Sequence, residues 1–195
     1  MQEQAPRRQL LNLKLSLIGA ALMASLLAAV ETSAQTLANA GNPATVEFNK
    51  RVAAYVELHK KADSQVPSLK RTDDPAEIAS RTVALADAIR AARANARPGD
   101  IMTHTVAEEF RRLIKKDYRS RSRNDRRIFL DEVPHFRPNV NQTYPSNWPL
   151  ATFPTTLFDV MPKLPEILEY RLLSEALILR DVTANLVVDF ILDVY

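Results

Sequence analysis

The spacing of apolar residues predicts helices over the first two thirds of the chain. Apolar side chains recur every three or four residues in three segments, which predicts helices over about 44–62, 75–96 and 104–118. A short fourth helix is predicted over about 124–131. In the first helix, Phe48, Val52, Tyr55, Val56 and His59 share one face. This part of the chain is therefore expected to be a set of packed helices.

Residues at the expected ends of these helices support the assignment. Asp74 followed by Pro75 is a typical helix start, and the sequence Arg97-Pro98-Gly99 is expected to end the same helix. The predicted buried stripe of this second helix consists of Ile78, Thr82, Leu85, Ile89 and Ala96. In the third helix, Thr105 and Glu108 have the spacing of a capping box.

The pattern changes after Val133, where the helical period is lost. Seven of the twelve prolines lie between Pro134 and Pro165, and one short helix is predicted from Pro154 to Val160. Three aliphatic runs then predict antiparallel strands at 168–173, 176–182 and 186–192, and residues 137–143 are a candidate for a further strand. The predicted fold class is α+β: a helical half, residues 44–132, packed on a small C-terminal antiparallel β-meander within residues 133–195.

The N-terminal residues have the layout of a cleavable secretory signal peptide. Arg7, Arg8 and Lys14 precede an apolar run of sixteen residues, and the small residues Thr32 and Ala34 follow it. The run is shorter than the about 20 residues of a membrane-spanning helix, which favours cleavage over a retained anchor. The expected organisation is a signal peptide at 1–34, a linker at 35–43 and a single domain at 44–195.

We therefore expect a periplasmic or secreted protein with no stable membrane span after cleavage. The general secretory route is favoured over the twin-arginine route, because Arg7-Arg8 lack the flanking Ser or Thr of the twin-arginine motif. With no cysteine, the chain has neither a thiol for a lipid anchor nor a disulfide. Cleavage after Ala34 removes three bases and two acids, so the net charge falls from +3 to +2. Overall charge alone then indicates no partner.

The C-terminal stretch resembles a known group of sequences. The runs Lys163-Leu-Pro-Glu-Ile-Leu-Glu-Tyr-Arg-Leu-Leu173, Ala176-Leu-Ile-Leu-Arg-Asp-Val182 and Asn185-Leu-Val-Val-Asp-Phe-Ile191 resemble the end of an uncharacterised family of secreted bacterial proteins. The segment Pro98-Gly-Asp-Ile101 is similar to that family too. The terminal hairpin is distantly similar to that of small periplasmic proteins of the nickel and cobalt homeostasis type. The first family has no assigned activity, so the resemblance implies export but no site residue.

The residue content excludes several kinds of catalytic site. After cleavage only Gly41 and Gly99 remain, whereas phosphate-binding loops, dinucleotide fingerprints and nucleophile elbows need closely spaced glycines. Without cysteine there is no thiolate nucleophile, iron–sulfur cluster or thiolate zinc site. His104 and Glu108 could share a helix face as metal ligands, but no third ligand stands at a suitable spacing. His59 and His135 are interpreted as packing or surface residues, and no cofactor or metal is expected.

Carboxylates near the predicted sheet are the remaining catalytic candidates. Glu169 and Arg171 alternate with apolar residues and are expected on a solvated face. Asp181 and Asp189 lie inside apolar strands, where we interpret them as charges beside turns or at a sheet edge. Burial beside an arginine and a catalytic role are the alternatives for these two aspartates. A hydrolase that uses such carboxylates is therefore the second functional hypothesis.

The strongest local charge lies between Arg111 and Arg127. Nine Lys or Arg residues face only Asp117 and Asp125 there, a balance of +7, whereas residues 159–195 carry seven acids and three bases, a balance of −4. This basic stretch is either a solvated face, paired in part with the acidic sheet, or a site for an anionic partner. The candidate anion-binding residues are Arg119, Arg121, Arg123, Arg126 and Arg127.

These observations favour a non-enzymatic exported protein that interacts with the cell envelope. Its expected partner is an anionic envelope component or another envelope protein. Nucleic acid is not expected as a partner, because export separates the protein from it.

Overall fold

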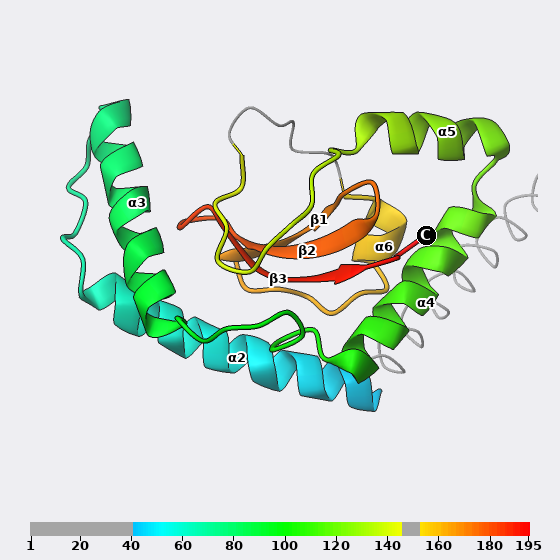
Figure 1. Ribbon diagram of the computed structural model, residues 1–195, viewed down its shortest axis with the longest axis horizontal. Coiled ribbons are helices and arrows are strands. Elements are labelled where there is room, and N and C mark those ends of the chain that lie inside the picture. The colour runs from blue at the N-terminus through cyan, green and yellow to red at the C-terminus, as the bar shows by residue number, and fades with distance from the viewer. Residues whose placement is uncertain (1–40, 146–152) are drawn as a thin grey trace, which may run out of the picture. The chain divides into compact units, whose positions relative to one another are not determined.

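In the computed structural model, which describes residues 41–145 and 153–195, helices pack against a three-stranded antiparallel sheet (Figure 1). The helices precede the sheet in the chain, so the predicted α+β class is confirmed. The expected signal peptide and residues 35–40 of the expected linker lie outside the described residues. No helix in the described ranges is long and apolar enough to cross a membrane.

Five helices are described. They are α2 (Pro43–Ser64), α3 (Pro75–Ala92), α4 (His104–Ser120), α5 (Arg123–Glu132) and α6 (Thr155–Phe158). Asn42 caps α2 and Asp74 caps α3, since each side chain accepts a hydrogen bond from the main-chain amide two residues later. Each cap is followed by a proline, whose fixed φ angle suits the first helical position.

Two helix predictions were wrong in detail. The capping box is absent, because α4 begins at His104 and Thr105 already lies inside the helix. The carboxylate of Glu108 instead lies 3.7 Å from the ring of His104. Helix α3 ends at Ala92 rather than at Arg97, and only its second half is buried, so Ile78 is 44% exposed. Ile78 has helical spacing with the buried stripe, but no other element among residues 41–145 and 153–195 covers that stripe along its whole length.

The sheet has the strand order β1-β2-β3, with β1 (Leu168–Leu172), β2 (Ala176–Asp181) and β3 (Leu186–Leu192). Both pairs are antiparallel, as predicted. The candidate strand at 137–143 is not a strand. Thr143 makes one isolated bridge to Leu186, and the amides of Asn141 and Tyr144 donate to carbonyls of residues 187 and 185. This segment therefore extends the outer edge of β3 irregularly.

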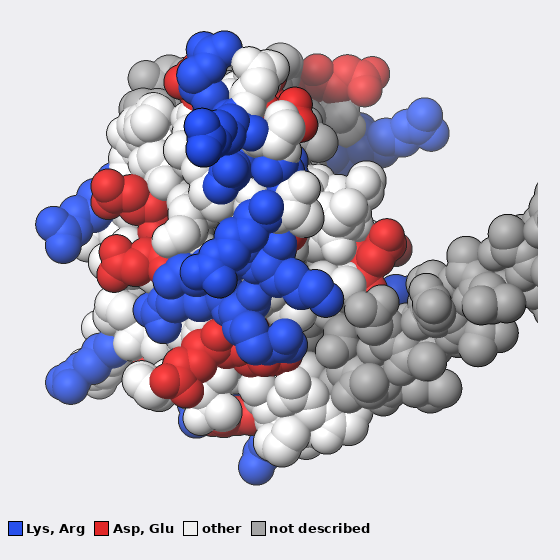
Figure 2. Space-filling view, turned by 90° about the vertical axis from the view of Figure 1, so that its right-hand side faces the viewer, with Lys and Arg blue, Asp and Glu red and all other residues white. Residues whose placement is uncertain are grey.

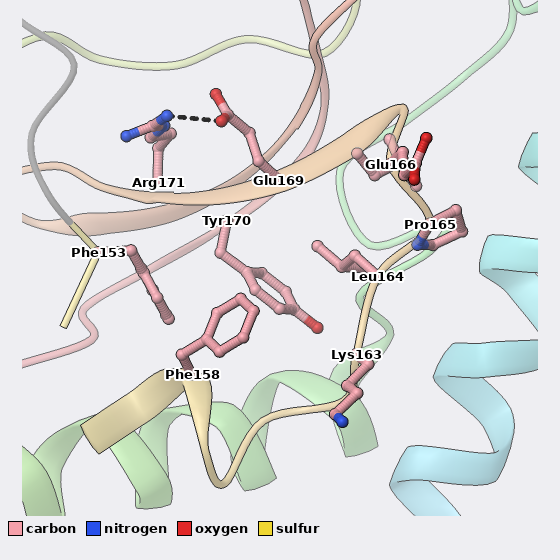
Figure 3. Close-up of a pocket in the computed structure, with 10 residues that line it drawn as sticks. Phe153, Phe158, Lys163, Leu164, Pro165, Glu166, Glu169, Tyr170 and Arg171 are labelled. Atoms are coloured by element: carbon pink, nitrogen blue, oxygen red, sulfur yellow. Dashed lines mark hydrogen bonds and ion pairs between the residues drawn. The ribbon is translucent and has the colours of Figure 1, made fainter. Parts of the chain in front are cut away.

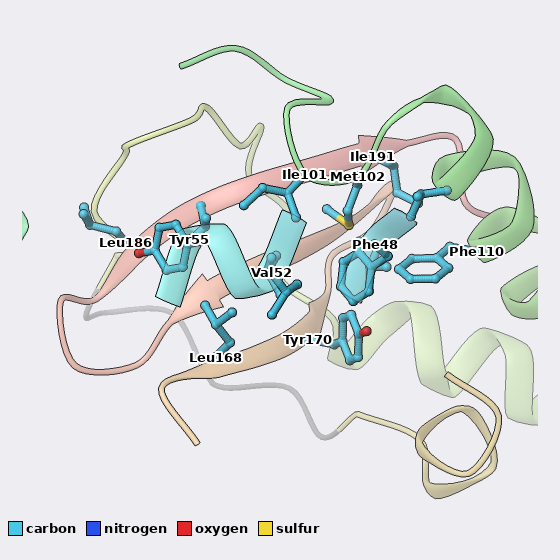
Figure 4. Packing of buried hydrophobic residues seen from close by; sticks show 14 of the residues in the cluster. Phe48, Val52, Tyr55, Ile101, Met102, Phe110, Leu168, Tyr170, Leu186 and Ile191 are labelled. Carbon is cyan, nitrogen blue, oxygen red and sulfur yellow. The ribbon is translucent and has the colours of Figure 1, made fainter. Parts of the chain in front are cut away.

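Different segments of the chain pack against the two faces of the sheet. On one face, Leu168, Tyr170 and Leu172 of β1 pack with Phe48 of α2 and Phe110 of α4 (Figure 4). On the other face, a smaller cluster joins Ile178 and Val187 to Tyr144 and Phe136 of the segment after α5. Strand β2 contributes to both clusters. Its nearly continuous apolar sequence follows from this burial on both faces.

Candidate functional site

Asp189 is fully buried, and its carboxylate holds the loop between α3 and α4. Oδ1 accepts hydrogen bonds from the amides of Gly99 at 2.9 Å and Phe190 at 2.8 Å. Oδ2 accepts from the amides of Ile101 at 2.8 Å and Met102 at 2.7 Å. The loop can turn sharply there because Gly99 has a φ of +89°. Four main-chain donors leave this carboxylate little capacity to take part in a reaction.

Asp181 is also fully buried and anchors the turn between β2 and β3. Its Oδ1 accepts from the Thr183 hydroxyl and the Ala184 amide, both at 2.8 Å, and its Oδ2 accepts from the Tyr55 hydroxyl at 2.7 Å. His59 lies nearby, with Nε2 at 2.9 Å from the Thr183 hydroxyl oxygen. Burial, together with the charge of Asp181, raises the pKa of Tyr55 well above its ordinary value.

Asp181 does flank the turn between β2 and β3, as predicted, but neither aspartate is an exposed edge charge, because both are fully buried. The alternative of burial beside an arginine holds in part for Asp189, because the buried Arg93 interacts with its charge, although the hydrogen-bond partners of Asp189 are amides. Sequence alternation does not reveal such carboxylates. Some of their donors are distant in the chain, such as Met102, 87 residues before Asp189, and Tyr55, 126 residues before Asp181.

Glu169 and Arg171 lie on the face predicted, but they are half-buried rather than solvated. Glu169 accepts hydrogen bonds from Arg171 at 2.5 Å and from Arg180 at 2.6 Å. Burial opposes the charge of Glu169, but these two guanidinium groups outweigh it and lower the pKa of Glu169 below its usual value. The carboxylate is thus committed to an ion pair within the sheet.

The histidines do not form a metal centre in the described residues. No group of three His, Asp or Glu side chains there is arranged to hold a metal ion. His104 and Glu108 are exposed on α4, and His135 is exposed in the segment after α5. His59 is the one that packs into the core, where it is 6% exposed.

The outer surface of α4 carries a row of cations. Arg112, Lys116 and Arg119 are exposed and spaced by four and three residues, so they lie above one another on the helix. The buried side chains of α4, including Phe110 and Ile114, point in the opposite direction. Figure 2 shows Lys and Arg side chains gathered on the side of the molecule where α4 and α5 lie.

We call the positively charged surface formed by the second half of α4, the residues after it and α5 the basic face. It consists of Lys115, Lys116, Arg119, Arg121, Arg123, Arg126 and Arg127. The five arginines were predicted from the sequence, and the two lysines were missed. The spacing of four and three residues between Arg112, Lys116 and Arg119 is the sequence signal that could have identified Lys116.

Members of the basic face differ in how far they are already neutralised. Arg121 donates to Asp117 at 2.9 Å and lies over the ring of Phe129. Arg126 lies over the ring of Tyr118, and Arg127 is 3.6 Å from Asp131. Three exposed cations, Lys116, Arg119 and Arg123, have neither an ion pair nor a side-chain hydrogen bond with any described residue. These three have most capacity for an external anion.

The basic stretch and the acidic C-terminal part do not neutralise one another. Between the described residues of 111–127 and 159–195 there is no ion pair. Arg111 does reach the sheet, but it donates to the carbonyl oxygen of Leu192 at 2.9 Å rather than to a carboxylate. The alternative that the sheet pairs with the basic stretch is therefore contradicted for these residues.

A second surface feature was not predicted. A cleft of about 370 Å³ lies beside β1 and is walled by Phe153, Phe158, Leu164 and Tyr170 (Figure 3). We call it the aromatic cleft. Phe158 is 61% exposed, and the rings of Phe153 and Tyr170 stack with centroids 5.6 Å apart. The sequence signal was weak because these aromatic residues are separated by Pro-rich connections without a regular period.

Comparison with known proteins identifies no relative. No family model matches the chain, and no curated protein or solved structure matches it significantly.

Proposed function

We propose that this protein is an exported, non-enzymatic protein that binds an anionic component of the bacterial cell envelope through the basic face. The observation that carries the proposal is the set of exposed cations on α4 and α5, of which Lys116, Arg119 and Arg123 are not neutralised by any described residue. Figure 2 displays this concentration of positive charge on one side of the domain.

The arrangement favours binding of a surface or a polymer over binding of a small anion. Exposed cations lie on both α4 and α5, so several can contact an extended anionic partner at the same time. Each exposed contact is weak by itself, about 0–1 kcal/mol for a typical surface pair, so affinity depends on their number. Arginine adds geometric selectivity, because its planar fork matches the two oxygens of a phosphate or carboxylate.

Export is part of the same proposal. Its support is the layout of residues 1–34 and the resemblance to uncharacterised secreted proteins. Two segments that carry this resemblance, Pro98–Ile101 and Asn185–Ile191, contact each other through the hydrogen bonds of Asp189. This contact holds the loop between α3 and α4 in place, but it assigns no activity.

The alternative of a carboxylate-dependent hydrolase has less support. Asp181 and Asp189 are fully buried and hydrogen-bonded, and Glu169 is held by two arginines. A hydrolytic pair requires carboxylates that can reach a substrate.

A triple substitution tests the proposal. The purified protein with Lys116→Gln, Arg119→Gln and Arg123→Gln should lose retention on vesicles of anionic lipid or on an anionic wall polymer. The matched control is Lys61→Gln, Lys70→Gln and Arg71→Gln, which removes the same charge from exposed positions outside the basic face. The control should be retained like the unchanged protein.

Salt provides the second arm of this experiment. Retention should fall as the ionic strength rises towards about 0.15 M, where the screening length is about 8 Å. If the two triple variants lose retention equally, net charge rather than the basic face is responsible. If the unchanged protein binds neither probe at low salt, the proposal is wrong.

A further inference from the structure

The two outer edges of the sheet differ in how many of their main-chain groups are hydrogen-bonded to described residues. Along β3, the amide of Asn141 donates to the carbonyl of Val187, and the amide of Val187 donates to the carbonyl of Gln142, both at 2.8 Å. Further along, Arg111 donates to the carbonyl of Leu192. The main-chain groups of Val187 and the carbonyl of Leu192 thus have partners within the chain, which hinders pairing of this edge with another strand.

The outer edge of β1 has no such cover from the described residues. Val182 donates its amide to Ile167, and hydrogen-bonded positions alternate along an antiparallel pair, so the main-chain groups of Leu168 and Tyr170 point away from β2. The amide of Leu168 is satisfied by the carbonyl of Pro165. The carbonyl of Leu168 and both main-chain groups of Tyr170 have no hydrogen bond with any residue in 41–145 or 153–195.

The aromatic cleft lies along this same edge. It contacts four consecutive residues of β1, Leu168 to Arg171. Successive side chains of a strand point to opposite faces, so a cleft that contacts all four must lie at the edge of the strand rather than over one face. Its volume of about 370 Å³ is in the range of natural binding clefts, which is about 300–1,000 Å³.

We propose that the aromatic cleft is a docking site for an extended peptide segment of another protein, which adds to the outer edge of β1 as a fourth strand. The carbonyl of Leu168 and the two main-chain groups of Tyr170, which no described residue bonds, supply the backbone hydrogen bonds, and the cleft receives alternate side chains. This mode of recognition combines affinity from main-chain pairing with selectivity from pockets for every second residue.

The residues around the cleft define the chemistry of the peptide. Side chains that point to one face of the extended peptide meet the rings of Phe158 and Tyr170 and are apolar (Figure 3). Those between them meet the ion pair of Glu169 and Arg171 on the opposite face and are charged or polar. The partner is therefore a segment in which apolar and charged residues alternate.

A peptide fits this site better than a second copy of the domain does. The segment from Lys163 to Glu166 contributes to the wall of the cleft together with Phe158, so the edge of β1 lies in a slot. A single extended strand can enter such a slot, whereas the edge of another folded sheet brings its neighbouring strand and loops with it.

The test uses a labelled hexapeptide, acetyl-Thr-Phe-Lys-Leu-Glu-Val-amide, and the purified full chain. Binding is followed by fluorescence anisotropy, and exchange of the Tyr170 amide is followed by mass spectrometry. We expect saturable binding at micromolar to millimolar peptide and slower exchange at Tyr170. The substitution Phe158→Ala should weaken binding about tenfold, which corresponds to about 1.4 kcal/mol. The control Ile128→Ala, exposed on α5 outside the cleft, should bind like the unchanged protein.

Two N-methylated peptides separate strand addition from simple apolar contact. One carries methyl groups on the amide nitrogens of Phe, Leu and Val, and the other on those of Thr, Lys and Glu. Only one set of nitrogens can face β1, so one peptide should bind at least about tenfold more weakly than the other. Equal binding of both, or no binding of the parent peptide, overturns the proposal.

A final measurement addresses self-association. If sedimentation shows a dimer without peptide that Phe158→Ala abolishes, the occupant is a second copy and the proposal is wrong. The basic face contributes nothing to the cleft, so this result and the test of envelope binding can fail independently.

Discussion

The carboxylate of Asp189, in the last strand, accepts a hydrogen bond of 2.7 Å from the main-chain amide of Met102, 87 residues earlier. Met102 is itself buried and lies just before α4. This bond and its neighbours at Gly99 and Ile101 therefore place the start of α4 relative to the sheet. Lys115, Lys116 and Arg119 of the basic face lie on α4. Asp189 therefore helps to position these cations, although it does not belong to the basic face.

Removing the Asp189 carboxylate should destabilise the domain strongly. Asp189→Ala leaves the buried amides of Ile101 and Met102 without acceptors, and an unsatisfied buried polar group costs about 1–3 kcal/mol. We expect a loss of at least about 3 kcal/mol in the free energy of unfolding, measured by urea denaturation. Asp73→Ala, at an exposed position, is the control and should change stability by less than about 0.5 kcal/mol. Equal stability of the two variants would contradict the anchoring role.

The hydroxyl of the buried Tyr55 should contribute more to stability than that of the half-buried Tyr118. Tyr55→Phe removes the donor to the buried carboxylate of Asp181, and we expect a loss of about 1–3 kcal/mol. Tyr118→Phe is the matched control, because the hydroxyl of Tyr118 has no hydrogen bond with the described residues. The two melting curves decide the comparison. If both variants melt at the temperature of the unchanged protein, the bond between Tyr55 and Asp181 contributes little.

Lowering the pH should reduce the free energy of unfolding, in part through protonation of Glu169. Its two arginine partners lower its pKa in the folded state, so its contribution is complete above the unfolded value of 4.5. The contribution is lost as the pH falls below 4.5 and through the lower pKa of the folded state. The free energy of unfolding should therefore fall less in Glu169→Gln than in the unchanged protein when the pH is lowered from neutral to below 4.5. An unchanged slope in the variant, measured by urea denaturation at several pH values, would count against this assignment.

Export and cleavage can be tested on protein from the producing cells. We expect the mature chain to begin at Gln35, because Thr32 and Ala34 are small residues at the positions that a signal peptidase reads. Intact-mass measurement or N-terminal sequencing of the periplasmic and secreted fractions gives the answer. A chain that starts at Met1 and stays with the membranes would show that the segment is a retained anchor instead.

Local sequence signals were sufficient for most secondary structure. The Asp74-Pro75 pair placed the start of α3, and the aliphatic runs placed all three strands to within a residue or two. These features depend on neighbouring residues, since caps, fixed φ angles and alternation act over a few positions. The same holds for the positive charge of 111–127, which is a property of composition along one stretch.

Relations between distant segments could not be predicted in this way. Asp181 and Asp189 looked like edge charges because their donors, such as Tyr55 and Met102, come from the other end of the domain. Ile78 is exposed because no element in the described ranges covers that part of α3, and periodicity does not report such a lack of cover.

What the sequence by itself determined is therefore the α+β order of elements, the strand pairing and the presence of a basic stretch. Only the tertiary structure decided which of its cations have no ion pair with a described residue, that Asp181 and Asp189 are anchors, and that an aromatic cleft runs along β1. The physical reason is the range of the interactions. Secondary structure and local charge arise within a few residues, whereas burial, ion pairing and cavities depend on which distant surfaces the folded chain brings into contact.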